Sequence, residues 1–248
     1  MLPWYETESK GVRVTKQGAE FVETPAAASS DATISRRVDL ELKDDGSARG
    51  KLLVDLAGQS GALRRTRSRR DDETGRQKSI EREVKGWLPA GSTFEMTSIG
   101  NWDDTSLPVH IEGTVTVPQM GSAAGHRMLV PLALFRTSFR ADFETERRVN
   151  PVYFSFRIEE KDDLKIHGPA GYKVETIPPR KVINPGTTMA YEITPSEDGG
   201  GIEVKRHFTL NDIHFPVDSY AALRSFFNLV KSNDEAQVVL QNAETAKN

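Results

Sequence analysis

The sequence contains no cysteine in its 248 residues. That absence excludes a cysteine nucleophile, a thiolate metal site and any disulfide bond. It does not identify the compartment, because the reduced cytosol and a disulfide-free periplasmic protein are both compatible with it. The sequence also lacks the run of about 18 apolar residues that a membrane-spanning helix needs. Residues 1–11 have neither the basic segment nor the apolar segment of a signal peptide.

Motifs that mark common catalytic and cofactor sites are missing as well. The patterns GxSxG, HExxH, GxGxxG and GxxxxGK followed by Ser or Thr do not occur. The net charge of −3 and the pI near 6.0 give no overall field that favours nucleic acid or an anionic membrane. We therefore expect no nucleic acid partner and no membrane span.

Basic residues concentrate in one predicted helical segment, which an acidic block follows. The segment contains Arg64, Arg65, Arg67, Arg69 and Arg70, then Asp71, Asp72 and Glu73, then Arg76 and Lys78. One interpretation is a helix that binds phosphate or another polyanion. The other is a solvated helix whose basic and acidic residues pair at i, i+4. No aromatic residues interleave with the arginines to stack on bases, which favours the second interpretation.

The remaining polar candidates have weak signals. The five histidines, none at a metal-ligand spacing, are His110, His126, His167, His207 and His214. Two acidic pairs resemble glycosidase carboxylates but fit turns better: Asp103–Asp104 and Asp162–Asp163. Gly91–Ser92 and Gly121–Ser122 fit turns too, and Trp4 or Trp102 could stack on a sugar. We therefore expect no catalytic residue, no cofactor-binding residue and no metal ligand.

The clearest amphipathic helix lies in residues 215–241. Its apolar residues recur at a spacing of three and four, which places them on one helix face: Tyr220, Leu223, Phe226, Phe227 and Val230. Asp218 or Ser219 can cap its start. A short β-type run, residues 238–240, follows. We expect this helix and last strand to close a β-rich domain.

Strand patterns dominate the first half of the chain. Residues 11–24 read as a hairpin, and residues 34–42 and 51–56 as a second hairpin with a turn at Asp44–Gly46. Residues 59–87 predict two helices divided near Gly75, with Ile80, Val84 and Trp87 on one face. Residues 94–99 and 109–117 read as strands. The segment 25–120 is therefore predicted to be a β-β-α-α-β-β domain.

The sequence of the second half predicts many short strands. Residues 128–135 form an apolar run broken by Pro131, which favours an edge or crossing segment. Strands are then predicted at 152–158, 164–166, 172–177, 188–193 and 202–210, with turns that include Lys161–Asp163. Such spacing is typical of an antiparallel sandwich. The predicted fold is mainly β with minor α, in two β-rich domains (25–120 and 121–248). The second is an antiparallel β-sandwich closed by the C-terminal helix and strand.

Several segments together resemble the C-terminal part of bacterial transglutaminase-like proteins, which have a papain-like catalytic core. The segments are Asn150–Phe154, Gly168–Glu175 with Pro178, Phe215–Pro216 and Tyr220–Phe227. The start, Leu2–Tyr5 through Phe21–Pro25, is similar to the tail of the core, so residues 1–24 are expected to be a remnant of it. One departure is Gly168, where the family usually has leucine.

The resemblance implies a β-rich region of unknown function beside a Cys-His-Asp core. Since the chain has no cysteine, no catalytic residue carries over, and we expect it not to be an enzyme. The resemblance also implies an accessory region that positions the core of the same full-length protein, or a protein or peptide substrate. A stand-alone module that binds carbohydrate or cell-wall polymer is the alternative, and an independent hydrolase a third. Export as part of a longer bacterial protein is one option for the compartment.

Overall fold

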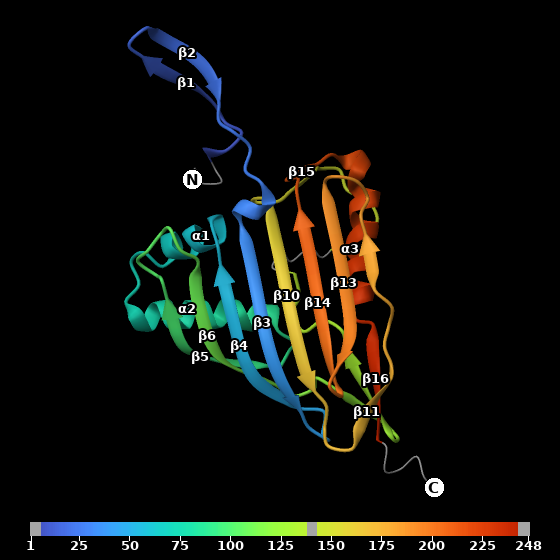
Figure 1. The fold of residues 1–248 in the computed structure, drawn as a ribbon. Coiled ribbons are helices and arrows are strands. Elements are labelled where there is room, and N and C mark those ends of the chain that lie inside the picture. Colours follow the sequence, from blue (N-terminus) through green and yellow to red (C-terminus); the bar gives the residue numbers. More distant parts are fainter. Residues whose placement is uncertain (1–5, 138–142, 243–248) are drawn as a thin grey trace.

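The computed structural model describes residues 6–137 and 143–242 (Figure 1). The helices are α1 (Gln59–Arg67), α2 (Glu73–Trp87) and α3 (Tyr220–Asp234), with short 3-10 turns η2 (Ser29–Asp31) and η3 (Val217–Ser219). The strands are β1 (Lys10–Thr15), β2 (Gly18–Glu23), β3 (Thr33–Leu42), β4 (Ala48–Leu56), β5 (Thr93–Gly100), β6 (Val109–Val117), β7 (Ser122–Ala124), β8 (Arg127–Pro131), β9 (Val152–Tyr153), β10 (Ile158–His167), β11 (Tyr172–Thr176), β12 (Lys181–Ile183), β13 (Met189–Asp198), β14 (Gly201–Leu210), β15 (His214–Phe215) and β16 (Gln237–Asn242). The prediction of a mainly β fold, with a C-terminal helix followed by a strand, is confirmed.

One eight-stranded sheet forms the centre of the molecule, in the order β12-β13-β14-β10-β3-β4-β6-β5. The strands β3 and β10 pair in parallel, with Arg36 opposite Asp162, and every other pair in this sheet is antiparallel. This parallel pair joins the two predicted segments 25–120 and 121–248, each of which contributes four strands. The boundary near residue 120 stays a prediction, while the sheet itself is continuous across it.

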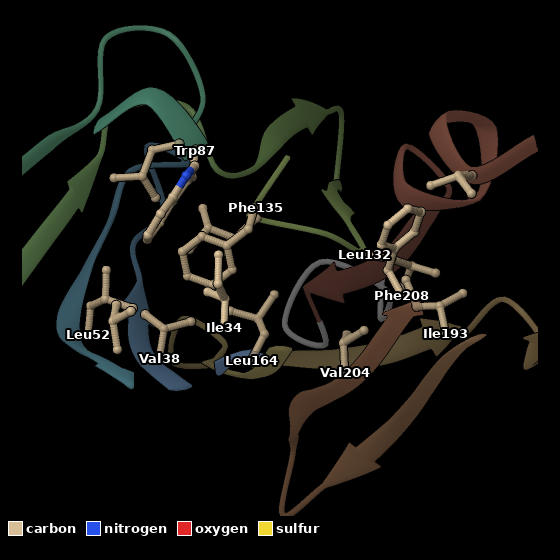
Figure 2. Close-up of a cluster of buried hydrophobic side chains, with 14 of the residues drawn as sticks. Ile34, Val38, Leu52, Trp87, Leu132, Phe135, Leu164, Ile193, Val204 and Phe208 are labelled. Carbon is tan, nitrogen blue, oxygen red and sulfur yellow. The ribbon is translucent and has the colours of Figure 1, made fainter. Parts of the chain in front are cut away.

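Mostly apolar side chains cover one face of this sheet. Figure 2 shows them pointing from the strands towards a second layer that contains Trp87, Leu132 and Phe135. On β3 and β4 the inward positions are alternate residues, because successive side chains of a strand point to opposite faces. Leu52 and Ile34 are fully buried there. The helices α2 and α3 and a smaller sheet supply the covering layer.

The smaller sheet has the order β11-β16-β8-β7 and is antiparallel throughout. Its strand β16 contributes the buried residues Val238 and Leu240, and β8 contributes Met128 and Val130. These belong to the same core as the central sheet. The helix α3 buries the five apolar residues predicted for its inner face, and Phe226 and Phe227 pack against Phe208 of β14. The predicted helix with its buried face, followed by a last strand, is therefore confirmed.

Four local predictions were wrong, each because other contacts outweighed the local signal. Gly75 lies inside α2, and residues 68–72 separate the helices, because Asp72 caps α2 through the amide of Gly75. Only the ends of the predicted strand 152–158 are strand, because Val152–Tyr153 form β9 and β10 begins at Ile158. The predicted edge segment is β8, which lies between β16 and β7 and ends at Pro131. The predicted turn Lys161–Asp163 is the middle of β10.

The opposite face of the central sheet bears polar and charged side chains, and none of the described helices covers it (Figure 1). Exposed or half-buried residues alternate with buried ones along β3, β6, β10 and β14. We call this surface the open face. Because these strands pair side by side, their outward-pointing side chains form one continuous polar surface.

The predicted hairpin at 11–24 is confirmed as β1 and β2, which project away from the rest of the molecule (Figure 1). Val12 faces Phe21 and Val14 faces Ala19 across the pair, so these four side chains share one surface of the ribbon. They are largely exposed, with Phe21 91% and Val14 81% accessible. We call them the hairpin apolar face.

Candidate functional site

The arginine cluster is divided between structural and solvated roles. Arg64 is buried and binds Glu83 of α2, while its Nη1 donates to the Ser60 carbonyl at 2.9 Å. Arg65 donates to four backbone carbonyls in the loop between β5 and β6. The exposed members are Arg67, Arg69 and Arg70. The first two arginines therefore hold α1 against its neighbours, through partners other than the acidic block expected from the sequence.

Three of the histidines lie on the open face, and each contacts a carboxylate. His110 Nδ1 is 2.6 Å from Asp55, His167 Nε2 is 2.7 Å from Asp39, and His207 Nε2 is 2.8 Å from Glu159. The hydrogen bond to Asp55 raises the pKa of His110. Within residues 6–137 and 143–242 no group of three or more His, Cys, Asp or Glu side chains is arranged to hold a metal ion.

The two acidic pairs lie in different kinds of structure, one in a turn and the other in a strand. Asp104 accepts hydrogen bonds from the backbone amide and hydroxyl of Ser106, which is a turn role as predicted. Asp162 and Asp163 are neighbours in β10, so their side chains point to opposite faces of the sheet. Asp162 is buried in the core, and Asp163 lies on the open face. They therefore cannot act together on one substrate.

The other candidates have local structural roles. Trp102 is half-buried against the core, and the guanidinium of Arg76 stacks 4.5 Å from its ring centroid. Ser92 lies in the turn before β5, and its amide donates to the Pro89 carbonyl. Ser122 is exposed at the start of β7. Trp4 lies outside the described residues.

A network of buried charges crosses three strands of the core face. Arg36 Nε lies 2.6 Å from Asp162, and Arg36 Nη2 lies 2.9 Å from Glu160. On the neighbouring strand Arg206 Nη1 donates to Asp162 at 3.2 Å and Nε donates to Asp234 of α3 at 2.8 Å. The side chains of Arg36 and Glu160 are fully buried. We call these five residues the buried ion network.

Aromatic rings enclose the network. The guanidinium of Arg36 lies 4.7 Å from the ring centroid of Phe135 and 5.4 Å from that of Trp87. Tyr191 donates its hydroxyl to Asp234 at 2.7 Å. Burial and the charge of Asp234 raise the pKa of Tyr191, so this hydroxyl stays protonated. The network is largely buried, with Asp234 its most exposed member at 16%, and it joins the end of α3 to the centre of the sheet.

The network could be anticipated only in part. In β10 the buried residues Ile158, Glu160, Asp162, Leu164 and Ile166 alternate with half-buried or exposed ones. Two acids in an otherwise apolar alternation indicate buried carboxylates, which require cationic partners. That signal was obscured because Lys161–Asp163 resembles a turn. The partners Arg36 and Arg206 come from remote segments, and only the strand register brings them together.

A shallow groove of about 680 Å³ lies on the open face over β3, β4, β10, β13 and β14. Both signs of charge line it: Arg37, Asp55, Lys161, Asp163, Lys205 and His207. Arg37 binds Asp55 at 3.0 Å, and Lys161 binds Glu159 at 3.0 Å. Asp163 Oδ1 is buried and accepts no hydrogen bond within the described part of the chain. The groove has a volume typical of small-molecule pockets, and we take it as the candidate ligand site.

Comparison with known proteins adds a partial family match. Residues 126–240 match the family described as a domain of unknown function with a solved structure (DUF3858). No curated protein matches. The chain is similar to a crystal structure described as a putative protease from Parabacteroides distasonis, with 21% identity and a TM-score of 0.38. That match covers 46% of this chain and 23% of the other, so the chain spans about a quarter of that protein's length. The chain thus contains a region similar to a domain of unknown function, within a mainly β fold.

Proposed function

We propose that this chain is a non-catalytic accessory region of a transglutaminase-like protein, which positions the catalytic core or the core's protein or peptide substrate. The hairpin apolar face is the observation that carries the proposal. An isolated two-stranded hairpin is at best marginally stable in water, and a third strand or a packed surface stabilises it. Here the hairpin presents Val12, Val14 and Phe21 to solvent at 55–91% exposure.

Charge and attachment support the core as the occupant of this surface. The opposite side of the hairpin is polar, with Arg13 bound to Glu20 at 2.6 Å, so only one side favours an apolar partner. The hairpin base is anchored to the body, because Arg157 binds Glu8 at 2.8 Å. Residues 2–25 also carry the resemblance to the tail of the core. A core packed on the hairpin would then be held in a fixed position beside the sheet.

The direct test is binding between this chain and the transglutaminase-like domain that the proposal expects in the same full-length protein. Sedimentation velocity is expected to show a one-to-one complex. The double substitution Val12→Ser with Phe21→Ser should weaken it at least about tenfold, since two apolar contacts are lost. Val182→Ser is the matched control, because Val182 is 54% exposed on the edge strand β12, remote from the hairpin in sequence and sheet. Equal binding by all three proteins would overturn the proposal.

A separate assay tests the absence of catalysis. The purified chain is expected to show no hydrolysis of amide or ester substrates above buffer. A signal that is lost when one polar side chain is replaced would refute this part of the proposal and favour an independent hydrolase.

A further inference from the structure

We propose that the groove on the open face binds an extended polypeptide segment that carries both positive and negative side chains. This rests on the proposed function, because it names where a peptide substrate would lie. The proposal is independent of the hairpin apolar face. Its geometry comes from the cross-strand registers of β14, β10 and β3.

The unpartnered oxygen of Asp163 is the first argument. Buried polar atoms nearly always have a hydrogen-bond partner, and leaving a carboxylate oxygen without one is unfavourable. Asp163 lies between Lys205 and Arg37 in the registers, yet each of these cations binds another carboxylate. Lys205 is 3.5 Å from Glu203, and Arg37 is 3.0 Å from Asp55. Asp163 therefore brings a negative charge to the groove wall that its two neighbouring cations do not neutralise by direct contact.

The spacing of the charges is the second argument. Along one row of the open face, Lys205, Asp163 and Arg37 follow one another on three adjacent strands. Two strand spacings, about 10 Å, separate the cations, and side chains on one face of an extended chain, two or four residues apart, lie about 7 or 13 Å from one another. Acidic side chains near the two cations, with a basic side chain between them near Asp163, would therefore match the row.

The exposure of the cations is the third argument. The side chains of Arg37, Lys161 and Lys205 are 55%, 52% and 65% exposed, so each can reorient towards a ligand. Their aliphatic stems supply the apolar part of the groove wall. A polyanion fits worse, because Asp163 and Asp55 contribute negative charge to the floor. Among the described residues, no aromatic side chain other than His207 lines the groove, so stacking on bases is missing.

Calorimetric titration with defined peptides tests the proposal. The probe is a blocked peptide in which lysine and glutamate alternate, separated by single serines, and an all-serine peptide is the reference. We expect binding of the mixed-charge peptide that weakens as salt is added, because the pairs are near the surface. The all-serine peptide should not bind. Amide shift changes in NMR spectra should be confined to the strands that line the groove, β3, β4, β10, β13 and β14.

Two matched variants locate the site. Asp163→Asn keeps the shape but removes the charge, and should weaken binding at least about tenfold. Its thermal stability should not fall, because the substitution removes a negative charge whose buried oxygen has no hydrogen-bond partner among the described residues. Asp39→Asn is the control, since Asp39 is on the same face but outside the groove and is 58% exposed. It should bind as the wild type does.

Four results would overturn the inference: equal binding by Asp163→Asn, equal binding of the all-serine peptide, shift changes elsewhere on the molecule, or no binding at millimolar peptide. Binding of a cell-wall oligosaccharide in the groove, in place of the peptide, would overturn it in favour of a carbohydrate module. None of these outcomes changes the expected binding of the core to the hairpin apolar face. Failure of this inference can therefore be distinguished from failure of the proposed function.

Discussion

Replacing Arg36 by methionine removes one of the two positive charges from the buried ion network. In the wild type, two guanidiniums face the carboxylates of Glu160, Asp162 and Asp234, which gives a formal charge of −1. The substitution changes this to −2 in a site where Glu160 is fully buried. Methionine retains the apolar contacts to the enclosing rings, so the expected effect is mainly electrostatic.

The expected magnitude follows from the loss of both strong partners. Arg36 makes three hydrogen bonds shorter than or equal to 3.0 Å to Glu160 and Asp162. Breaking a buried pair from one side costs about 3–5 kcal/mol, because the remaining charge stays buried. Urea unfolding followed by circular dichroism should therefore show a lower midpoint with an unchanged slope.

A second substitution tests the cause. Adding Asp162→Leu to Arg36→Met removes one negative charge as well and returns the network to a formal charge of −1. Arg206 keeps Asp234 as its partner. The double variant should recover part of the lost unfolding free energy, as apolar replacement of buried pairs often does. A loss below about 1 kcal/mol for Arg36→Met, the range of exposed pairs, would refute the reasoning. So would a double variant less stable than the single one.

Three further predictions concern packing and pH. Phe226→Ala should lower the unfolding free energy by about 3–5 kcal/mol, because the buried ring packs on Phe208; no change would contradict the packing. The pKa of His110 is raised by its hydrogen bond to Asp55, so its stabilisation is present below the unfolded pKa of 6.5 and lost as pH rises through the folded value. His110→Gln should therefore destabilise more at about pH 5.5 than at about pH 8, measured by thermal unfolding, and an equal loss at both would contradict this. Gly50→Ala should disrupt the β3–β4 pairing, since a Cβ would lie 1.7 Å from a carbonyl oxygen of β3; an unchanged melting temperature would exclude this.

Local patterns in the sequence were sufficient for the elements whose signals are local. The period of 3.6 predicts α3 and its buried face, and alternation with the Asp44–Gly46 turn predicts β3 and β4. The absence of cysteine is by itself enough to exclude thiol chemistry by this chain. These inferences succeed because composition is independent of the fold, while period and turn chemistry depend on residues close together in the chain.

Local sequence patterns were not sufficient to predict the candidate site. Lys161–Asp163 has turn chemistry, but β10 is held between β3 and β14, and those partners fix it as a strand. That register buries Asp162 between Arg36 and Arg206 and places Asp163 in the groove. The sequence alone determined a mainly β chain without thiol chemistry. The tertiary structure decided which charges are buried and which line the groove, because pairing between residues 126 positions apart leaves no local pattern in the sequence.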